Sequence, residues 1–249
     1  IHLTNEETEN YQDISREAAK LEAIKIQGGQ IEEKVLKMLY MKRARIIGSA
    51  NNKFEKLDGL LGKLKKENHT LFYCGDGSVI EEYDDQDNQS NITRRDIERV
   101  ATLLNKHGWK SSRFTASEAL NERRRIIKNF VDEHIEAMVA IRVLDEGIDI
   151  PVCKQAFLLA SSRNERQFIQ RRGRILRKYT GKDLSVIHDF IVLPSEEINC
   201  DDVLLSLVSS EMDRVFEFSH VAANKDSAFT NAEQLSDKYG LDWLGIVYG

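Results

Sequence analysis

The chain has 249 residues, of which 41% are hydrophobic, and its formal net charge is -5. These values are sufficient for a packed core and exclude a uniformly basic nucleic-acid-binding protein. No run of 18 apolar residues occurs, which argues against a membrane-spanning helix. Cys74, Cys153 and Cys200 are isolated in sequence, which argues against structural zinc and indicates a reducing compartment, cytoplasmic or nuclear. The absence of a signal peptide and the start at Ile1 lead us to expect an excised fragment.

The first 66 residues show the periodicity of helices. Thr4 and Glu7 form the pattern of a capping box, which predicts the start of a first helix. Gly28-Gly29 would end that helix, and apolar residues from Ile31 to Leu39 have the spacing of a second. A third is predicted over Lys53–Lys66, with Phe54, Leu57, Leu61 and Leu64 on one side.

From residue 71 onward the pattern alternates between strands and helices. Strands are predicted over 71–74, 112–115, 138–143, 156–160 and 185–192. Helices are predicted over 92–107, 117–130 and 170–177, with further helices over 201–220 and 231–239. Such alternation predicts an α/β fold, a parallel sheet with helices on both faces. We expect a helical N-terminal extension at 1–46, a central lobe at 47–195, and C-terminal helices at 196–249 that pack on the lobe.

Two neighbouring segments carry residue types suited to a phosphate group. In the segment N-E-R-Q-F-I-Q-R-R-G-R-I-L-R, helical spacing places Gln170, Arg174 and Arg177 on one face, bordered by Gly173. Two guanidinium groups on one edge suit a phosphate, because arginine offers forked donors and stays charged. A solvated basic helix is the alternative interpretation. Just upstream, the apolar run from Met138 to Val143 leads into D-E-G-I-D-I-P, a strand followed by the type of turn at which α/β sheets bind ligands.

These segments resemble motifs of superfamily two helicases and translocases. V-L-D-E-G-I-D-I-P is similar to motif V, and Q-R-R-G-R-I-L-R is similar to motif VI. H-T-L-F-Y-C-G-D at 69–76 resembles the motif IV strand, and F-T-A-S-E-A-L-N-E-R-R-R-I-I-K-N-F at 114–130 resembles motif IVa. The resemblance covers about residues 47–220 and is closest to the branch of excision-repair translocases and restriction-associated helicases.

The resemblance implies that the chain is the second RecA-like lobe of an ATP-dependent motor. In such enzymes ATP lies between two lobes, and the first lobe carries the P-loop and holds Mg²⁺. By resemblance, Arg174 and Arg177 are the arginine fingers, and Gln170 orders the attacking water or the γ-phosphate. Asp149 resembles the acid that accepts a hydrogen bond from the ATP ribose, and Gly147 permits close backbone approach. A turn-capping carboxylate is the alternative role for Asp149.

A nucleic-acid track is expected on another face of the lobe. Thr115 and Ser117 stand at the start of one predicted helix, and Ser161 and Ser162 precede another. Helix N-termini offer free N–H groups to phosphates, although simple helix capping is an equal alternative. Many relatives place a threonine of motif V on the strand, whereas Ile141-Arg142 stands near that position here, so Arg142 is a candidate substitute.

No P-loop is present in the sequence. The stretch Gly59 to Leu64 has too few residues between its glycines and no Ser or Thr after Lys63. We therefore expect no ATP hydrolysis by the chain alone, and expect DNA, with RNA possible, and an N-terminal lobe of the same protein as partners. The competing hypothesis is a binding module, without catalysis, that binds nucleic acid or protein and regulates a separate ATPase.

Overall fold

The computed structural model describes residues 1–74, 86–115, 118–141, 150, 152–160, 173 and 175–242, with the backbone alone for 86–95. The chain divides into two compact units. One runs from Ile47 to Phe190, and the other combines Ile1–Ile46 with Ile191–Gly249. Among the described residues, no helix has the length and apolar character needed to cross a membrane.

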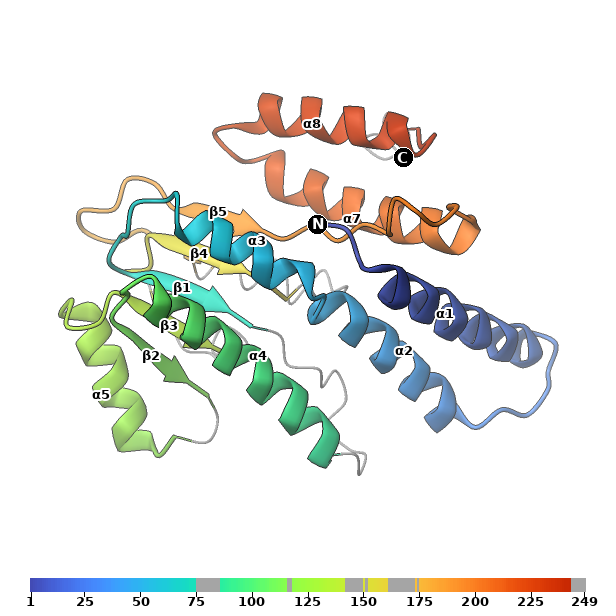
Figure 1. Cartoon of the computed structure of the whole chain (residues 1–249), viewed down its shortest axis with the longest axis horizontal. Coiled ribbons are helices and arrows are strands. Elements are labelled where there is room, and N and C mark those ends of the chain that lie inside the picture. Colours follow the sequence, from blue (N-terminus) through green and yellow to red (C-terminus); the bar gives the residue numbers. More distant parts are fainter. Residues whose placement is uncertain are drawn as a thin grey trace. The chain divides into compact units, whose positions relative to one another are not determined.

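The unit Ile47–Phe190 is built on a parallel sheet with the strand order β2-β3-β1-β4-β5 (Figure 1). Its strands are β1 (Thr70–Tyr73), β2 (Ser111–Phe114), β3 (Ala137–Ala140), β4 (Gln155–Leu158) and β5 (Val186–Asp189). The three central strands are buried at every position, whereas the edge strands β2 and β5 are partly exposed. This burial explains why the central strands appear in the sequence as continuous apolar runs.

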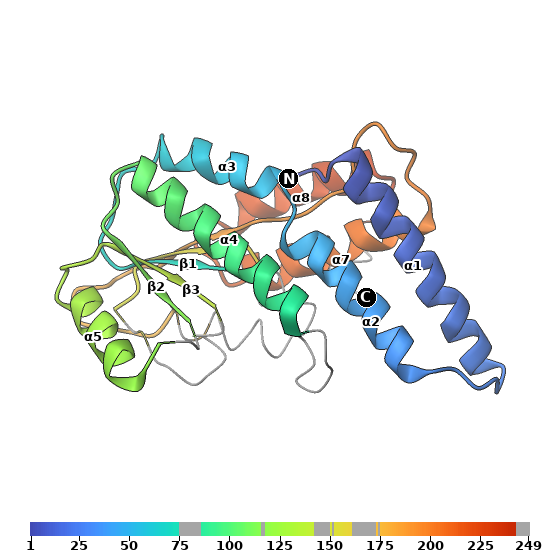
Figure 2. The same ribbon diagram turned by 60° about the horizontal axis from the view of Figure 1, so that its bottom comes forward.

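Helices cover both faces of this sheet, as predicted. They are α3 (Asn52–Leu61), α4 (Gln86–Lys106) and α5 (Leu120–Val131). In Figure 2, α3 and α4 lie above the sheet and α5 lies below it. Phe72 of β1 stacks on Phe157 of β4, with ring centroids 4.6 Å apart, and meets the edge of the Trp109 ring at 5.8 Å. These ring contacts join the middle of the sheet to the segment that follows α4.

The second unit brings together the two ends of the sequence. Its helices are α1 (Asn5–Ile26), α2 (Glu33–Gly48), α7 (Asp202–Ser219) and α8 (Lys225–Lys238). Ala18 of α1 packs with Leu36 and Leu39 of α2, and α7 packs against both α1 and α8. From the sequence, residues 1–46 and 196–249 were predicted as two separate helical extensions. In the structure both ranges belong to one compact unit. Packing of the C-terminal helices on the lobe stays a prediction.

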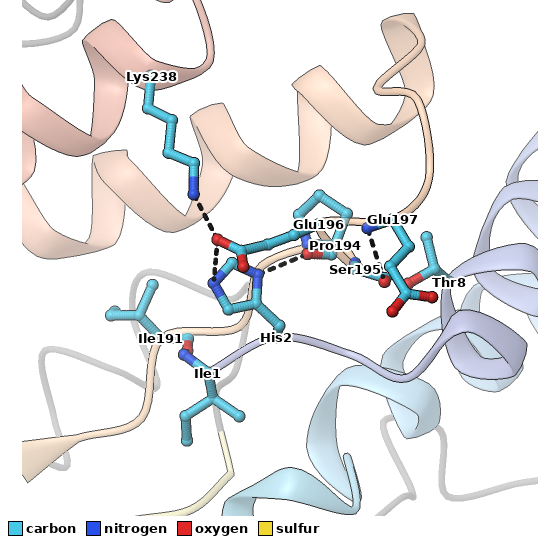
Figure 3. Close-up of polar contacts among 9 residues, drawn as sticks. All are labelled: Ile1, His2, Thr8, Ile191, Pro194, Ser195, Glu196, Glu197 and Lys238. Atoms are coloured by element: carbon cyan, nitrogen blue, oxygen red, sulfur yellow. Dashed lines mark hydrogen bonds and ion pairs between the residues drawn. The ribbon is translucent and has the colours of Figure 1, made fainter.

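The N-terminal segment and the segment after β5 are joined directly (Figure 3). His2 and Leu193 form a parallel bridge, and the Leu3 N–H donates to the Leu193 carbonyl at 2.8 Å. His2 contacts Glu196 at 3.5 Å, and Lys238 of α8 forms an ion pair with the same carboxylate. The buried Thr8 hydroxyl accepts a hydrogen bond from the Ser195 N–H at 3.0 Å. Hydrogen bonds across about 190 residues of sequence therefore hold this unit together.

One predicted helix start is confirmed and several other boundaries are corrected. The capping box at Thr4 and Glu7 is present, with both reciprocal hydrogen bonds. The third helix ends at Leu61 and not at Lys66, because Gly62 caps it. The helix predicted from Ile92 begins at Gln86, and the one predicted from Ser117 begins at Leu120. The helix predicted from Asn231 begins at Lys225.

Candidate functional site

The predicted functional segments all follow the carboxyl ends of strands in the parallel sheet. The backbone ladder continues one residue beyond each of β1, β3 and β4. Cys74 N–H donates to the Ala140 carbonyl at 2.9 Å, Ile141 N–H to Phe114 at 3.2 Å, and Leu159 N–H to Tyr73 at 3.0 Å. Parallel strands end at one edge of a sheet, which is where α/β proteins place their ligands. The segments that follow Thr115, Ile141 and Ala160 therefore all begin at the same edge of the sheet.

Thr115 lies one residue beyond β2 and is engaged by a carboxylate. Its hydroxyl lies 2.9 and 3.0 Å from the two carboxylate oxygens of Glu118, and its N–H donates to the same group at 2.5 Å. Its carbonyl accepts from Arg123 at 2.8 Å. Helix α5 begins at Leu120, with Ala119 as a cap that offers no side-chain hydrogen bond. The expectation that Thr115 opens this helix is therefore wrong, because Thr115 bonds to Glu118 in the intervening turn.

The end of the motif VI segment is fixed by a lysine and a serine. Gly173 and Ile175 are helical, whereas Leu176 and Arg177 lie beyond the helix. Lys182 donates to the carbonyls of Ile175 at 2.6 Å and Arg177 at 2.9 Å. Ser185 donates to the Ile175 carbonyl at 3.3 Å. A cation on the last carbonyls is a favourable end for a helix, because it opposes the partial negative charge there.

Arg177 is an exposed residue at this end, and Gly173 adjoins open space. The predicted placement of Arg177 on a continuous helix is corrected, since the helix ends before it. Burial lowers the pKa of Lys182. The exposed guanidinium group of Arg177 is chemically suited to a phosphate.

A buried polar cluster, which was not predicted from the sequence, also lies at this edge of the sheet. Lys53 of α3 is completely buried, and its ammonium group donates to the carbonyl of Leu159, directly after β4, and to Gly48 at 3.3 Å. Asp96 of α4 is buried and accepts from the Ser49 hydroxyl at 2.6 Å. A signal did exist, because Lys53, Leu57 and Leu61 have i, i+4, i+8 spacing and share the buried side of α3.

The histidine of β5 has a role in packing. His188 stacks on the Phe157 ring, with centroids 4.4 Å apart, and its Nε2 lies 2.9 Å from the Gln155 amide. Burial lowers the pKa of His188. Gln155 in turn accepts from the Thr70 hydroxyl at 3.2 Å. These contacts give His188 a structural role within the sheet.

The other predicted site residues lie outside the described residues. They are Gln170, Arg174, Gly147, Asp149, Ser117, Arg142, Ser161 and Ser162. Within the described ranges, no group of three or more His, Cys, Asp or Glu side chains has an arrangement that could hold a metal ion.

Comparison with known proteins identifies the type of domain. The family model described as the helicase conserved C-terminal domain matches residues 52–179, slightly more than half of the chain. The DNA 3'-5' translocase XPB2 of Sulfurisphaera tokodaii is 43% identical over 58 residues, 23% of this chain and 13% of that protein. The putative ATP-dependent RNA helicase MJ1505 of Methanocaldococcus jannaschii is 29% identical over 185 residues, 68% of this chain and 24% of that protein. The chain thus spans at most about a quarter of the length of these relatives.

Two of the similar solved structures are of DEAD-box proteins. A DEAD box protein from Methanococcus jannaschii has a TM-score of 0.42 and 22% identity, covering 59% of this chain and 34% of that one. The C-terminal domain of the DEAD-box protein Dbp5 has a TM-score of 0.41 and 18% identity, covering 66% of this chain and 78% of that one.

Proposed function

The chain belongs to the helicase conserved C-terminal domain family, and from this premise we propose that it is the second motor lobe of an ATP-dependent DNA helicase or translocase. One observation carries the proposal. The family match at 52–179 contains every residue predicted to contact ATP or nucleic acid, from Thr115 to Arg177. Within that family, the chain is proposed to be closest to the branch of excision-repair translocases and restriction-associated helicases. RNA in place of DNA is the alternative for the nucleic acid that it binds.

The arrangement at the sheet edge supports the proposed division of roles. The segments that contain Arg142, Asp149 and Ser161 follow β3 and β4, the two neighbours of β1 in the sheet. ATP with Mg²⁺ would bind between this lobe and a first lobe that supplies the P-loop and the metal site. When bound, ATP supplies the phosphoryl group that is transferred to water. Arg174 and Arg177 would offset the charge on that group, Gln170 would orient the water, and Gly147 and Asp149 would hold the nucleoside.

The donor types fit this role. Arginine is always charged, and its forked donors match phosphate oxygens. Arg177 is exposed, and Lys182 donates to its backbone carbonyl, which fixes the point from which its side chain starts. Arginine fingers in other NTPases accelerate phosphoryl transfer by about 10³ to 10⁵.

The decisive test uses the full-length protein with both lobes. Arg174→Ala and Arg177→Ala should each lower kcat steeply while the far-UV circular dichroism spectrum is unchanged. Arg172→Ala is the matched control, because it removes the same charge from the same segment, and it should affect turnover much less. Equal losses in all three variants would instead indicate a general basic patch.

The isolated chain provides the second arm of the test. We expect no ATP hydrolysis above background with or without DNA, because the chain has no P-loop. Turnover by the purified chain that disappears in Arg174→Ala would refute the two-lobe interpretation. A chain that instead stimulates or inhibits a separate ATPase, with no contribution from Arg174, would support the binding-module alternative.

A further inference from the structure

Lys53 is a charged residue in a position where an apolar one would pack equally well. It stands on the buried side of α3 with Leu57 and Leu61, and its side chain is 0% exposed. Removing an ammonium group from water is unfavourable unless other groups replace the lost hydration. A role beyond packing is therefore needed to account for the lysine.

The partners of Lys53 identify that role. Its ammonium group donates to the carbonyl of Leu159 and, at 3.3 Å, to the carbonyl of Gly48 at the end of α2. The Leu159 N–H already donates to the Tyr73 carbonyl of β1 at 3.0 Å. Both backbone polar groups of Leu159 are thus held, one by the neighbouring strand and the other by Lys53.

Asp96 of α4 is a buried acidic group whose charge interacts with that of Lys53. It is 8% exposed, and burial raises its pKa, although the Ser49 hydrogen bond and the charges of Arg99 and Lys53 oppose this increase. The same two charges, Asp96 and Lys53, act on the buried thiol of Cys74, one residue beyond β1. The cluster therefore connects α3 and α4 to the ends of β1 and β4.

We propose that Lys53 is a positioning residue, which fixes the backbone at Leu159 and so the direction in which the chain leaves β4 toward Ser161 and the motif VI segment. The consequence for catalysis rests on the proposed function. A cation is suited to this task because its three N–H donors can hold several carbonyl groups at once. Only Ala160 separates Leu159 from Ser161, so a displaced carbonyl would alter the start of the segment that leads to Gln170 and Arg174.

The catalytic test compares three variants of the full-length, two-lobe protein. Lys53→Met keeps the length of the side chain but removes the charge. Because this leaves Asp96 buried with less compensation, the double variant Lys53→Met/Asp96→Asn removes both charges and should recover the thermal unfolding midpoint of the parent. Lys56→Met is the control, since Lys56 is exposed on the same helix. We expect kcat to fall at least tenfold in both Lys53 variants, with KM for ATP changed less than twofold, and no change in Lys56→Met.

A structural role alone would give a different result. In that case the double variant would recover kcat together with the unfolding midpoint, and this outcome would overturn the proposal. A double variant that unfolds like the parent but keeps the low kcat would support it.

Hydrogen exchange separates failure of this proposal from failure of the proposed function. In the isolated chain, the amide groups of Leu159 and Ala160 should exchange at least tenfold faster in the double variant than in the parent. Those of Leu57 and Leu61 should be unchanged. Unchanged exchange at Leu159 and Ala160 would overturn the positioning role even if ATP hydrolysis is confirmed. Faster exchange in the isolated chain, together with no ATP hydrolysis by the full-length protein, would support the positioning role and refute the proposed function.

Discussion

The hydroxyl group of Thr115 lies 2.9 Å from the Glu118 carboxylate, which also accepts the Thr115 backbone N–H. The carboxylate thus takes the donors that a nucleic-acid phosphate would take at this position. A phosphate that binds Thr115 must compete with a negative charge three residues away.

Replacing Glu118 should therefore strengthen nucleic-acid binding. We expect Glu118→Gln to tighten the binding of single-stranded DNA severalfold at low salt, because binding to phosphates is mainly electrostatic. Fluorescence anisotropy at two salt concentrations measures the effect. Glu122→Gln is the matched control, since Glu122 lies on α5, four residues away, and pairs with Arg125 at 3.3 Å. If both variants gain equally, net charge is the cause and Thr115 does not contact the track.

Arg142 and Asp149 should separate the two proposed sides of the motif V segment. In the full-length protein, Arg142→Ala should weaken DNA binding and DNA-stimulated hydrolysis while basal turnover is retained. Asp149→Ala should first raise KM for ATP. Steady-state kinetics with and without DNA, combined with anisotropy, distinguish the two effects. An Arg142→Ala variant that matches the parent in every assay would remove the case for a DNA contact there.

Thr8 should stabilise the unit formed by the two ends of the sequence. Its hydroxyl donates to the Thr4 carbonyl at 2.9 Å and accepts the buried Ser195 N–H at 3.0 Å. Thr8→Val preserves the shape but leaves that N–H without its acceptor, which should lower the free energy of unfolding by about 1–3 kcal/mol. Urea unfolding followed by circular dichroism measures this loss. Thr8→Ser retains the hydroxyl, so exchange of the Ser195 amide should accelerate in Thr8→Val alone; acceleration in both would assign the effect to the lost methyl group.

Asp58 should make stability depend on pH at the contact between α3 and α4. Hydrogen bonds from Lys106 at 2.7 Å and His107 at 2.6 Å lower the pKa of its carboxyl group. A lowered pKa in the folded state means that the stabilisation is present above the unfolded value, about 3.9, and is lost as pH falls through the folded value. Asp58→Asn should therefore be less stable than the parent at neutral pH, and the difference should disappear below about pH 3.

Unfolding midpoints measured across this pH range test the Asp58 prediction. Glu55→Gln is the control, because Glu55 is exposed on the same helix. A difference between parent and Asp58→Asn that persists at low pH would assign the effect to packing.

The sequence by itself determined the features that depend on neighbouring residues. The Thr4–Glu7 capping box, a buried strand predicted over 138–143 and found over Ala137–Ala140, and the alternation of strands and helices were all predictable. Each is specified by side chains two to four positions apart, and such spacing can be read without knowledge of the fold. The motif VI and motif V strings likewise indicated the helicase family because their residues are contiguous in sequence.

Only the tertiary structure decided which distant residues meet. It placed β1 between β3 and β4, joined Thr8 to Ser195 in one unit, and buried Lys53 against Leu159. It also placed the Thr115 hydroxyl against the Glu118 carboxylate, whereas helix capping and phosphate binding were equal alternatives from the sequence alone. Local spacing cannot specify these contacts, because a lysine on a helix is exposed or buried according to what packs above it. That outcome depends on the balance between desolvation and the partners that the whole fold supplies.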